Sequence, residues 1–269
     1  MKRQRIFLLS SLVAILLGIS TGCDNGFEEI NTNPNVPNTV TPNLLLPNII
    51  RSAANEIVGT GWSIGNIVVQ HTAKIQFVNE DRYLWGNING PWNNTYSNLR
   101  EIQNIYNIAS SAVPVQKNYQ GVALVLKSWQ IALGTDCYGD MPYSEAIQAK
   151  SGVTSPKYAT QEQIYATLLK DLETANDLLS PSNEPIQGDI LFNGNALRWK
   201  KMANSLRLRY LMRISNKKDV KAEMQAIVSN PSRFPIFENN ADNAALRYLP
   251  TVPNQFPPYT YRVGSIDEF

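Results

Sequence analysis

Cys137 stands between two carboxylates in the stretch GTDCYGD, an arrangement that could be a nucleophile flanked by acid–base groups. A thiol attacks as the thiolate, which needs a neighbouring base or positive charge to form. The sequence holds one histidine, His71, and it is far from this stretch. We therefore interpret the stretch as a helix end, with Gly139 as the turn residue and Asp136 and Asp140 accepting hydrogen bonds from nearby backbone N–H groups.

A second stretch, HTAKIQFVNEDRYLWGNINGPW at 71–92, is irregular and mixes aromatic, basic and amide side chains. Sugars present apolar C–H faces that pack on aromatic rings and hydroxyls that bond polar side chains, so this mixture suits a saccharide. We predict that Trp85 or Tyr83 stacks on a sugar ring while Arg82 and Asn87 bond hydroxyls. The alternative is that Trp85 only packs the loop on its scaffold.

The N-terminus predicts secretion. Basic residues among the first five precede an apolar run, 6–19, that is too short to cross a bilayer. The small residues Ser20-Thr21-Gly22 come next and Cys23 follows them, as in a lipoprotein whose cysteine is acylated. We predict a signal peptide over 1–22 and lipidation of Cys23. The alternative is an ordinary signal peptide cut near a chance cysteine.

Composition excludes several classes of function. Three of the 24 basic residues leave with the signal peptide, so the remaining chain has one more acidic than basic residue and no global attraction for nucleic acid. The predicted helix 195–215 is basic, but Trp199 and Tyr210 fall on its apolar stripe and are interpreted as core. With one histidine and no convergent acid–base pair, we expect no metal, no cofactor and no catalysis.

Helical periodicity follows a Pro-rich segment, 23–43, that we interpret as a tether. Thr160 and Gln163 form a capping box that opens a helix over 161–180. The apolar stripes comprise Leu46, Ile49, Ile50, Ala53 and Ile57; Trp92, Tyr96, Leu99, Ile102, Tyr106 and Ala109; Val122, Leu126, Trp129 and Leu133; Tyr165, Leu168, Leu172, Ala175 and Leu179; and Trp199, Ala203, Leu206 and Tyr210. A shorter helical segment is expected over 220–228, and Ile190–Phe192 is expected to form a small hairpin arm.

Four segments together resemble the SusD/RagB family of outer-membrane nutrient-binding lipoproteins. They are CDNGFEEINTNPN at the cysteine, GTDCYGDMPYSEA, PKYATQEQIYATLLKDLETANDLL and GDILFNGNALRWKKMANSLRLRYLMRIS. The resemblance implies a mainly α fold of tetratricopeptide-like helical pairs with long irregular loops. It also implies a surface-exposed, lipid-anchored protein that binds oligosaccharide, does no bond chemistry and serves a SusC-like TonB-dependent transporter in the outer membrane. In such proteins a loop before the second helix contributes to the glycan site.

Members of that family are about twice as long as this chain. We therefore expect residues 44–269 to be a SusD-like helical domain truncated at its C-terminus, from either a fragment or a shortened gene. Two alternatives stay open: a helical-repeat scaffold that binds a protein or peptide, and an inactive fragment.

Replacing Cys23 with Ala should release the protein from the membrane fraction, because acyl chains on that cysteine would supply the anchor. Fractionation of cells followed by immunoblotting measures this, and Cys137→Ala is the matched control that should stay in the membrane fraction. Membrane retention of Cys23→Ala equal to that of the wild type would contradict the anchor.

Overall fold

The structure is a computed structural model that describes residues 39–260. The expected signal peptide, Cys23 and most of the expected tether lie outside the described residues. The first described helix, α3, begins at Pro42, so the last two residues of the expected tether belong to it. Proline is favoured at the first helical positions because it has no N–H to leave unpaired there. No helix within the described residues is both long and apolar enough to cross a membrane.

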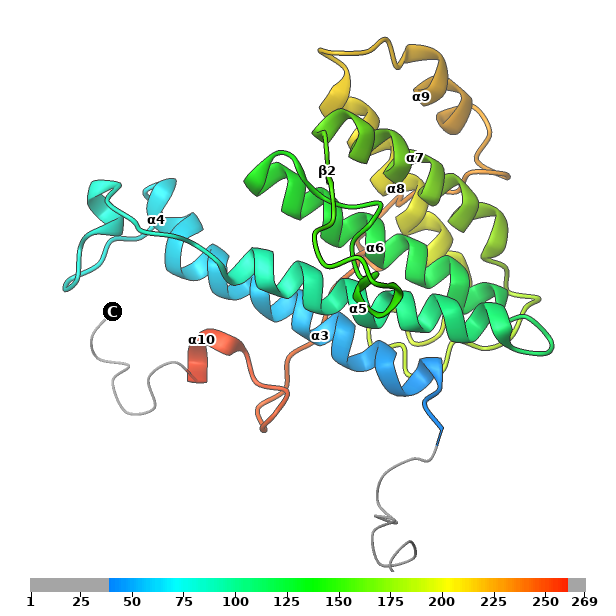
Figure 1. The fold of residues 1–269 in the computed structure, drawn as a ribbon, viewed down its shortest axis with the longest axis horizontal. Helices are drawn as coiled ribbons and strands as arrows, with labels where there is room; N and C mark the ends of the chain where they lie inside the picture. Colours follow the sequence, from blue (N-terminus) through cyan, green and yellow to red (C-terminus); the bar gives the residue numbers. More distant parts are fainter. Residues whose placement is uncertain (1–38, 261–269) are drawn as a thin grey trace, which may run out of the picture. The chain divides into compact units, whose positions relative to one another are not determined.

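Long α-helices dominate the described residues, as the sequence predicted (Figure 1). Every long helix after the first packs against the long helix that precedes it in the chain, and α6 also contacts α8. The long helices are α3 (Pro42–Thr60), α5 (Gly90–Ser111), α6 (Lys117–Tyr138), α7 (Gln161–Leu178) and α8 (Ala196–Ile214). Sequential packing of this kind is typical of stacked helical pairs.

Short elements fill the connections between the long helices. Strands β1 (Met141–Pro142) and β2 (Tyr158–Ala159) form an antiparallel pair in which Met141 faces Ala159. The others are a π-helical turn (Gly61–Gly65), α4 (Asn66–Val68), 3₁₀ turns (Glu80–Arg82, Ala149–Ser151 and Asn240–Asp242), α9 (Lys221–Val228) and α10 (Pro257–Thr260).

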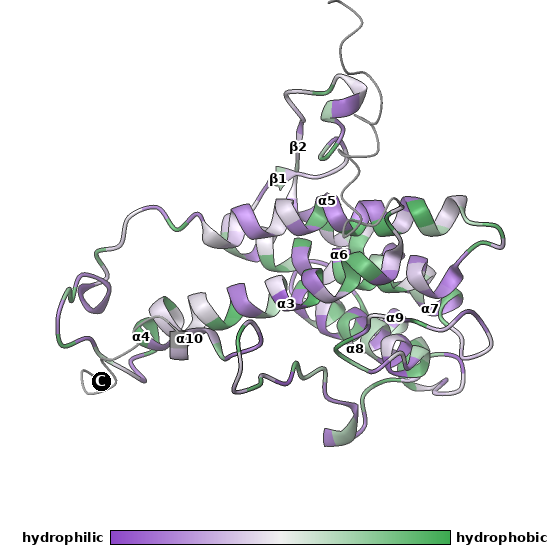
Figure 2. Cartoon of the chain, turned by 90° about the horizontal axis from the view of Figure 1, so that it is seen from below, coloured by the Kyte–Doolittle hydropathy of each residue, from purple (hydrophilic) through white to green (hydrophobic). Residues whose placement is uncertain are grey.

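The core lies where the long helices meet, and α6 is its centre. An uninterrupted run on α6, 121–126, is buried, while α5, α7 and α8 each bury one face. Apolar and hydrophilic segments accordingly alternate along α5 and α8 (Figure 2). The packing at the start of α6 is close: a Cβ added at Gly121 would lie 2.6 Å from Leu179 Cγ. The capping box of Thr160 and Gln163 at the start of α7 is confirmed.

The hairpin arm predicted at Ile190–Phe192 is wrong, because the segment is a turn built around the buried carboxylate of Asp189. Asp189 Oδ1 accepts hydrogen bonds from the N–H groups of Leu191 (2.9 Å) and Phe192 (3.1 Å). Its Oδ2 accepts from Gly194 N–H and from Trp199 Nε1. Because these N–H groups bond the Asp189 side chain, they are not available for the inter-strand hydrogen bonds that a hairpin would need.

The aspartates around Cys137 also differ from expectation. They bind partners far along the chain rather than nearby backbone N–H groups. Asp136 pairs with Arg213 at 2.8 Å and accepts a hydrogen bond from the hydroxyl of Tyr165 at 2.7 Å. Asp140 accepts from the N–H of Gln161, where a carboxylate meets the positive end of helix α7. Helix α6 does end before Gly139, whose φ is 75°, as predicted.

Residues 71–89, which hold most of the aromatic stretch and precede α5, are called the aromatic loop. Their return to α5 is fixed by one side chain at the end of α6. The hydroxyl of Tyr138 donates to the carbonyl of Ile88 at 2.6 Å and accepts from the N–H of Trp92 at 3.2 Å. The rings of Tyr138 and Trp92 also meet edge to face, with centroids 5.3 Å apart. Tyr138 therefore links the scaffold to the C-terminal end of the loop.

Trp199→Ala should lower the free energy of unfolding by about 3–5 kcal/mol, because it empties the space of a fully buried aromatic ring and leaves Asp189 short of a donor. Denaturant unfolding measures this. The control Trp85→Ala removes an exposed ring and should change stability by less than about 0.5 kcal/mol. Equal losses for the two variants would contradict the assignment of Trp199 to the core.

Tyr138→Phe should loosen the loop while the scaffold stays intact, because two backbone groups lose their partner at a cost of about 1 kcal/mol. Hydrogen exchange of the amides in 86–92 should quicken, and those of α7 should not change. The control is Tyr158→Phe, which removes a hydroxyl from an exposed side chain. Unchanged exchange in 86–92 would show that Tyr138 does not hold the loop.

Candidate functional site

The aromatic loop places Tyr83 and Trp85 together on the surface. Their ring centroids are 5.6 Å apart at 62°, an edge-to-face contact, and the two residues are 51% and 41% exposed. Tyr83 follows the 3₁₀ turn in a left-handed conformation, with φ at 58°. Each ring thus contacts the other and still offers surface to solvent.

Polar contacts hold the base of this loop. The hydroxyl of Tyr83 donates to the carbonyl of Val68 at 3.3 Å, which ties the ring to α4. Further along, Lys74 pairs with Glu80 at 2.7 Å, and its N–H donates to Asp81. The hydrogen bond from Lys74 lowers the pKa of the Glu80 carboxyl, so this carboxylate stays ionised at more acidic pH than an ordinary glutamate.

Arg82 and Asn87 lie on the same loop and both are exposed. Among the described residues, no hydrogen bond or ion pair engages either side chain. The structure brings Tyr83 and Trp85 into contact and leaves Arg82 and Asn87 available for a ligand. The loop also exposes three apolar side chains that were not singled out from the sequence, Ile75, Phe77 and Leu84, and Val69 is exposed just ahead of it.

A polar groove of about 650 Å³ lies where the loop rejoins the scaffold. Its lining comprises Ser52, Asn55, Glu56, Gly59, Thr60, Ser63, Asn94 and Pro257. Glu56 reaches the end of the loop, since a Cβ added at Gly90 would lie 2.7 Å from its Oε1. Thr60 donates to the same carboxylate oxygen at 2.8 Å. Sequence reasoning missed this groove, because polar positions on a helix are typical of a solvated face.

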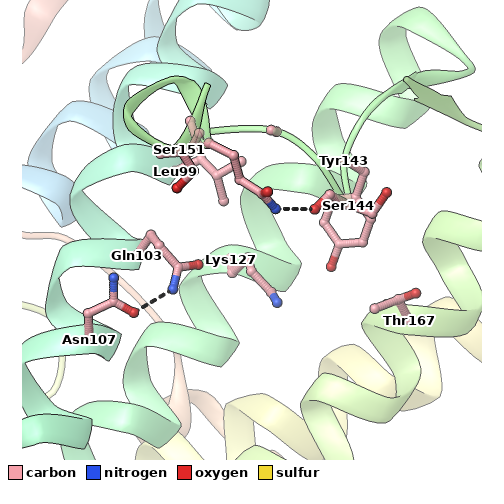
Figure 3. Close-up of a pocket in the computed structure, with 11 residues that line it drawn as sticks. Leu99, Gln103, Asn107, Lys127, Tyr143, Ser144, Ser151 and Thr167 are labelled. Carbon is pink, nitrogen blue, oxygen red and sulfur yellow. Dashed lines mark hydrogen bonds between the residues drawn. The ribbon is translucent and has the colours of Figure 1, made fainter. Parts of the chain in front are cut away.

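A second cavity, of about 500 Å³, lies between α5, α6, α7 and the segment that follows β1 (Figure 3). Lys127 from α6 and Tyr143 from that segment both reach its wall. Burial, followed by the neighbouring Asp171 carboxylate, raises the pKa of Tyr143, so its hydroxyl stays protonated and donates. Nothing in the sequence pattern indicated this cavity.

The surroundings of Cys137 do not favour a nucleophilic thiolate. Desolvation and the adjacent Asp136 carboxylate raise the pKa of the thiol, which opposes formation of a thiolate. Within residues 39–260, no group of three or more His, Cys, Asp or Glu side chains could hold a metal ion. The described sites are suited to binding through hydrogen bonds and ring contacts.

Comparison with solved structures finds the same helical fold in SusD homologues. A SusD homologue from Bacteroides fragilis NCTC 9343 is 26% identical, with a TM-score of 0.66 over 84% of this chain and 47% of its own. An outer membrane protein from Bacteroides vulgatus ATCC 8482, described in terms of nutrient binding, is 29% identical, with a TM-score of 0.64 over 81% and 46%. A chitin-binding protein is 32% identical, with a TM-score of 0.63 over 76% and 45%. The chain spans less than half the length of each.

No curated protein matched the sequence. The family model that matches is SusD-like and is described as starch-binding associating with outer membrane, and it covers residues 34–265. Because that match extends over most of the chain and the helical fold is shared with SusD homologues, the chain belongs to the SusD-like family.

Proposed function

We propose that this protein binds oligosaccharide or polysaccharide nutrients at the aromatic loop. The observation that carries the proposal is the exposed edge-to-face pair of Tyr83 and Trp85 on a loop anchored at both ends. An aromatic ring held at the surface offers an apolar face for the C–H groups of a sugar at a low entropic cost, because its side chain is already ordered. Membership of the SusD-like family and likeness to a chitin-binding protein support the same class of ligand.

The polar side chains complete the proposed site. In this proposal Arg82 and Asn87 supply donors and an acceptor for the sugar hydroxyls, since both side chains are exposed on the same loop as the rings. Each hydroxyl bond replaces one to water and contributes only about 1 kcal/mol net. Affinity should therefore be weak for a single sugar and rise with chain length.

The proposed setting is the cell surface. Acyl chains on Cys23 would anchor the protein in the outer membrane, and a SusC-like TonB-dependent transporter would receive the glycan. The outer-membrane description of the family supports this location.

A protein or peptide ligand is the second candidate. Ile75 and Phe77, on the aromatic loop ahead of Tyr83, are 73% and 79% exposed. Exposed apolar side chains that gather on one surface are typical of protein contacts and offer nothing to hydroxyls. This surface could serve a protein partner instead of, or together with, a glycan.

Trp85→Ala should weaken binding of chito- or malto-oligosaccharides about tenfold, because the stacked ring contributes on the order of 1–2 kcal/mol. Titration calorimetry of both series, from monosaccharide to longer oligomers, measures this. Phe77→Ala is the matched control, since it removes an exposed ring from the same loop and should leave glycan affinity unchanged. If the wild type binds a glycan and Trp85→Ala binds it equally well, the loop is scaffold and the site lies elsewhere.

A further inference from the structure

The cavity between α5, α6 and α7 has the dimensions of a ligand site. Its volume of about 500 Å³ falls inside the range of about 300–1,000 Å³ that is usual for pockets that enclose small molecules. Gln103 and Asn107 of α5 face Lys127 of α6 across it, while Thr167 of α7 and Ser144 stand at its other side (Figure 3). Three helices and a loop therefore converge on one space.

A shielded ion pair supports part of the wall. Lys127 Nζ lies 2.7 Å from Asp171 Oδ2, and only 21% and 18% of these side chains are exposed. The hydroxyl of Tyr143 donates to the same carboxylate oxygen at 3.2 Å. Of this pair only Lys127 lines the cavity, and Asp171 holds its ammonium group in place from behind the wall. An ammonium group has three donors, and Asp171 takes one of them.

Donors and acceptors are mixed on the remaining wall. Gln103 Nε2 donates to Asn107 Oδ1 at 2.8 Å, which orients both amides and leaves Gln103 Oε1 and Asn107 Nδ2 without a partner among the described residues. Thr167 uses its hydroxyl proton on the carbonyl of Gln163, so its oxygen is turned into an acceptor. Anion sites are lined mainly by donors and cation sites mainly by acceptors. A set of both kinds fits hydroxyl groups, which donate and accept at once.

The apolar part of the wall includes a strained residue. Ile147 has a φ of 63°, although a β-branched side chain rarely adopts the left-handed region. Such a conformation is strained and persists where the surroundings enforce it, often at binding sites. Gln148 Nε2 donates to the carbonyl of Ser144 at 2.9 Å and closes the segment around Ile147. With Leu99 and Ala146, Ile147 gives the cavity an apolar surface beside the polar one.

We propose that this cavity is a second sugar site, separate from the aromatic loop, that takes a single neutral pyranose ring. Lys127 and Asn107 donate to ring hydroxyls, Gln103 and Thr167 accept from them, and the C–H face lies against Leu99 and Ile147. The inference does not depend on the loop, since no residue of the loop lines the cavity.

The proposal is tested by titrating ¹⁵N-labelled protein with three sugars and following the amide chemical shifts. D-glucose is neutral, D-glucuronate is an anion and D-glucosamine is a cation, so the same ring is offered in three charge states. Glucose should shift the amides of Asn107, Lys127 and Ser144, and the two charged sugars should bind more weakly. The double variant Gln103→Ala/Asn107→Ala should abolish these shifts. It should also fold, because both positions lie on α5 and alanine is the best helix former.

Trp85→Ala should leave the glucose shifts at the cavity unchanged, which separates this site from the proposed loop site. Several results would overturn the inference: no shift at the cavity amides with any of the three sugars, tighter binding of a charged sugar than of glucose, wild-type shifts in the double variant, or loss of the cavity shifts in Trp85→Ala.

Discussion

The burial of α6 among α5, α7 and α8 is the constraint on which the rest of the structure depends. A helix enclosed in this way must be apolar or small on nearly every side, and the approach of Leu179 to Gly121 shows how closely its neighbours sit. The polar residues that α6 does carry are therefore positioned by packing from several directions. Lys127 turns toward the cavity, and Tyr138 reaches out to the aromatic loop. One rigid helix thus supports both proposed binding regions.

Carboxylate side chains stabilise a turn between helices and a contact between helix ends. Asp189 organises the turn before α8, and Asp136 ties the end of α6 to Arg213 on α8. The helices were predictable because three- and four-residue periodicity is a local property, as was the cap at Thr160. The turn at Asp189 was not, because Ile190–Phe192 has the composition of a strand, and only its buried carboxylate makes it a turn.

The two candidate sites also differ in how far their residues could be predicted from the sequence. Tyr83 and Trp85 could be proposed from the sequence, because aromatic, basic and amide side chains are mixed within one short stretch of it. Gln103, Lys127 and Thr167 could not, since they come from three helices and each is unremarkable on its own helix. Only the packing of α5, α6 and α7 places them around one space (Figure 3).

The two proposed sites also differ in how firmly they are held. The aromatic loop is a surface segment held by single side chains, Tyr83 against α4 and Tyr138 at its return to α5. The cavity has helical walls on three sides and amides already oriented by a mutual hydrogen bond. A preorganised site loses less entropy on binding and selects more strictly for shape. The loop is accordingly suited to capture of varied chains, and the cavity to selection of one ring.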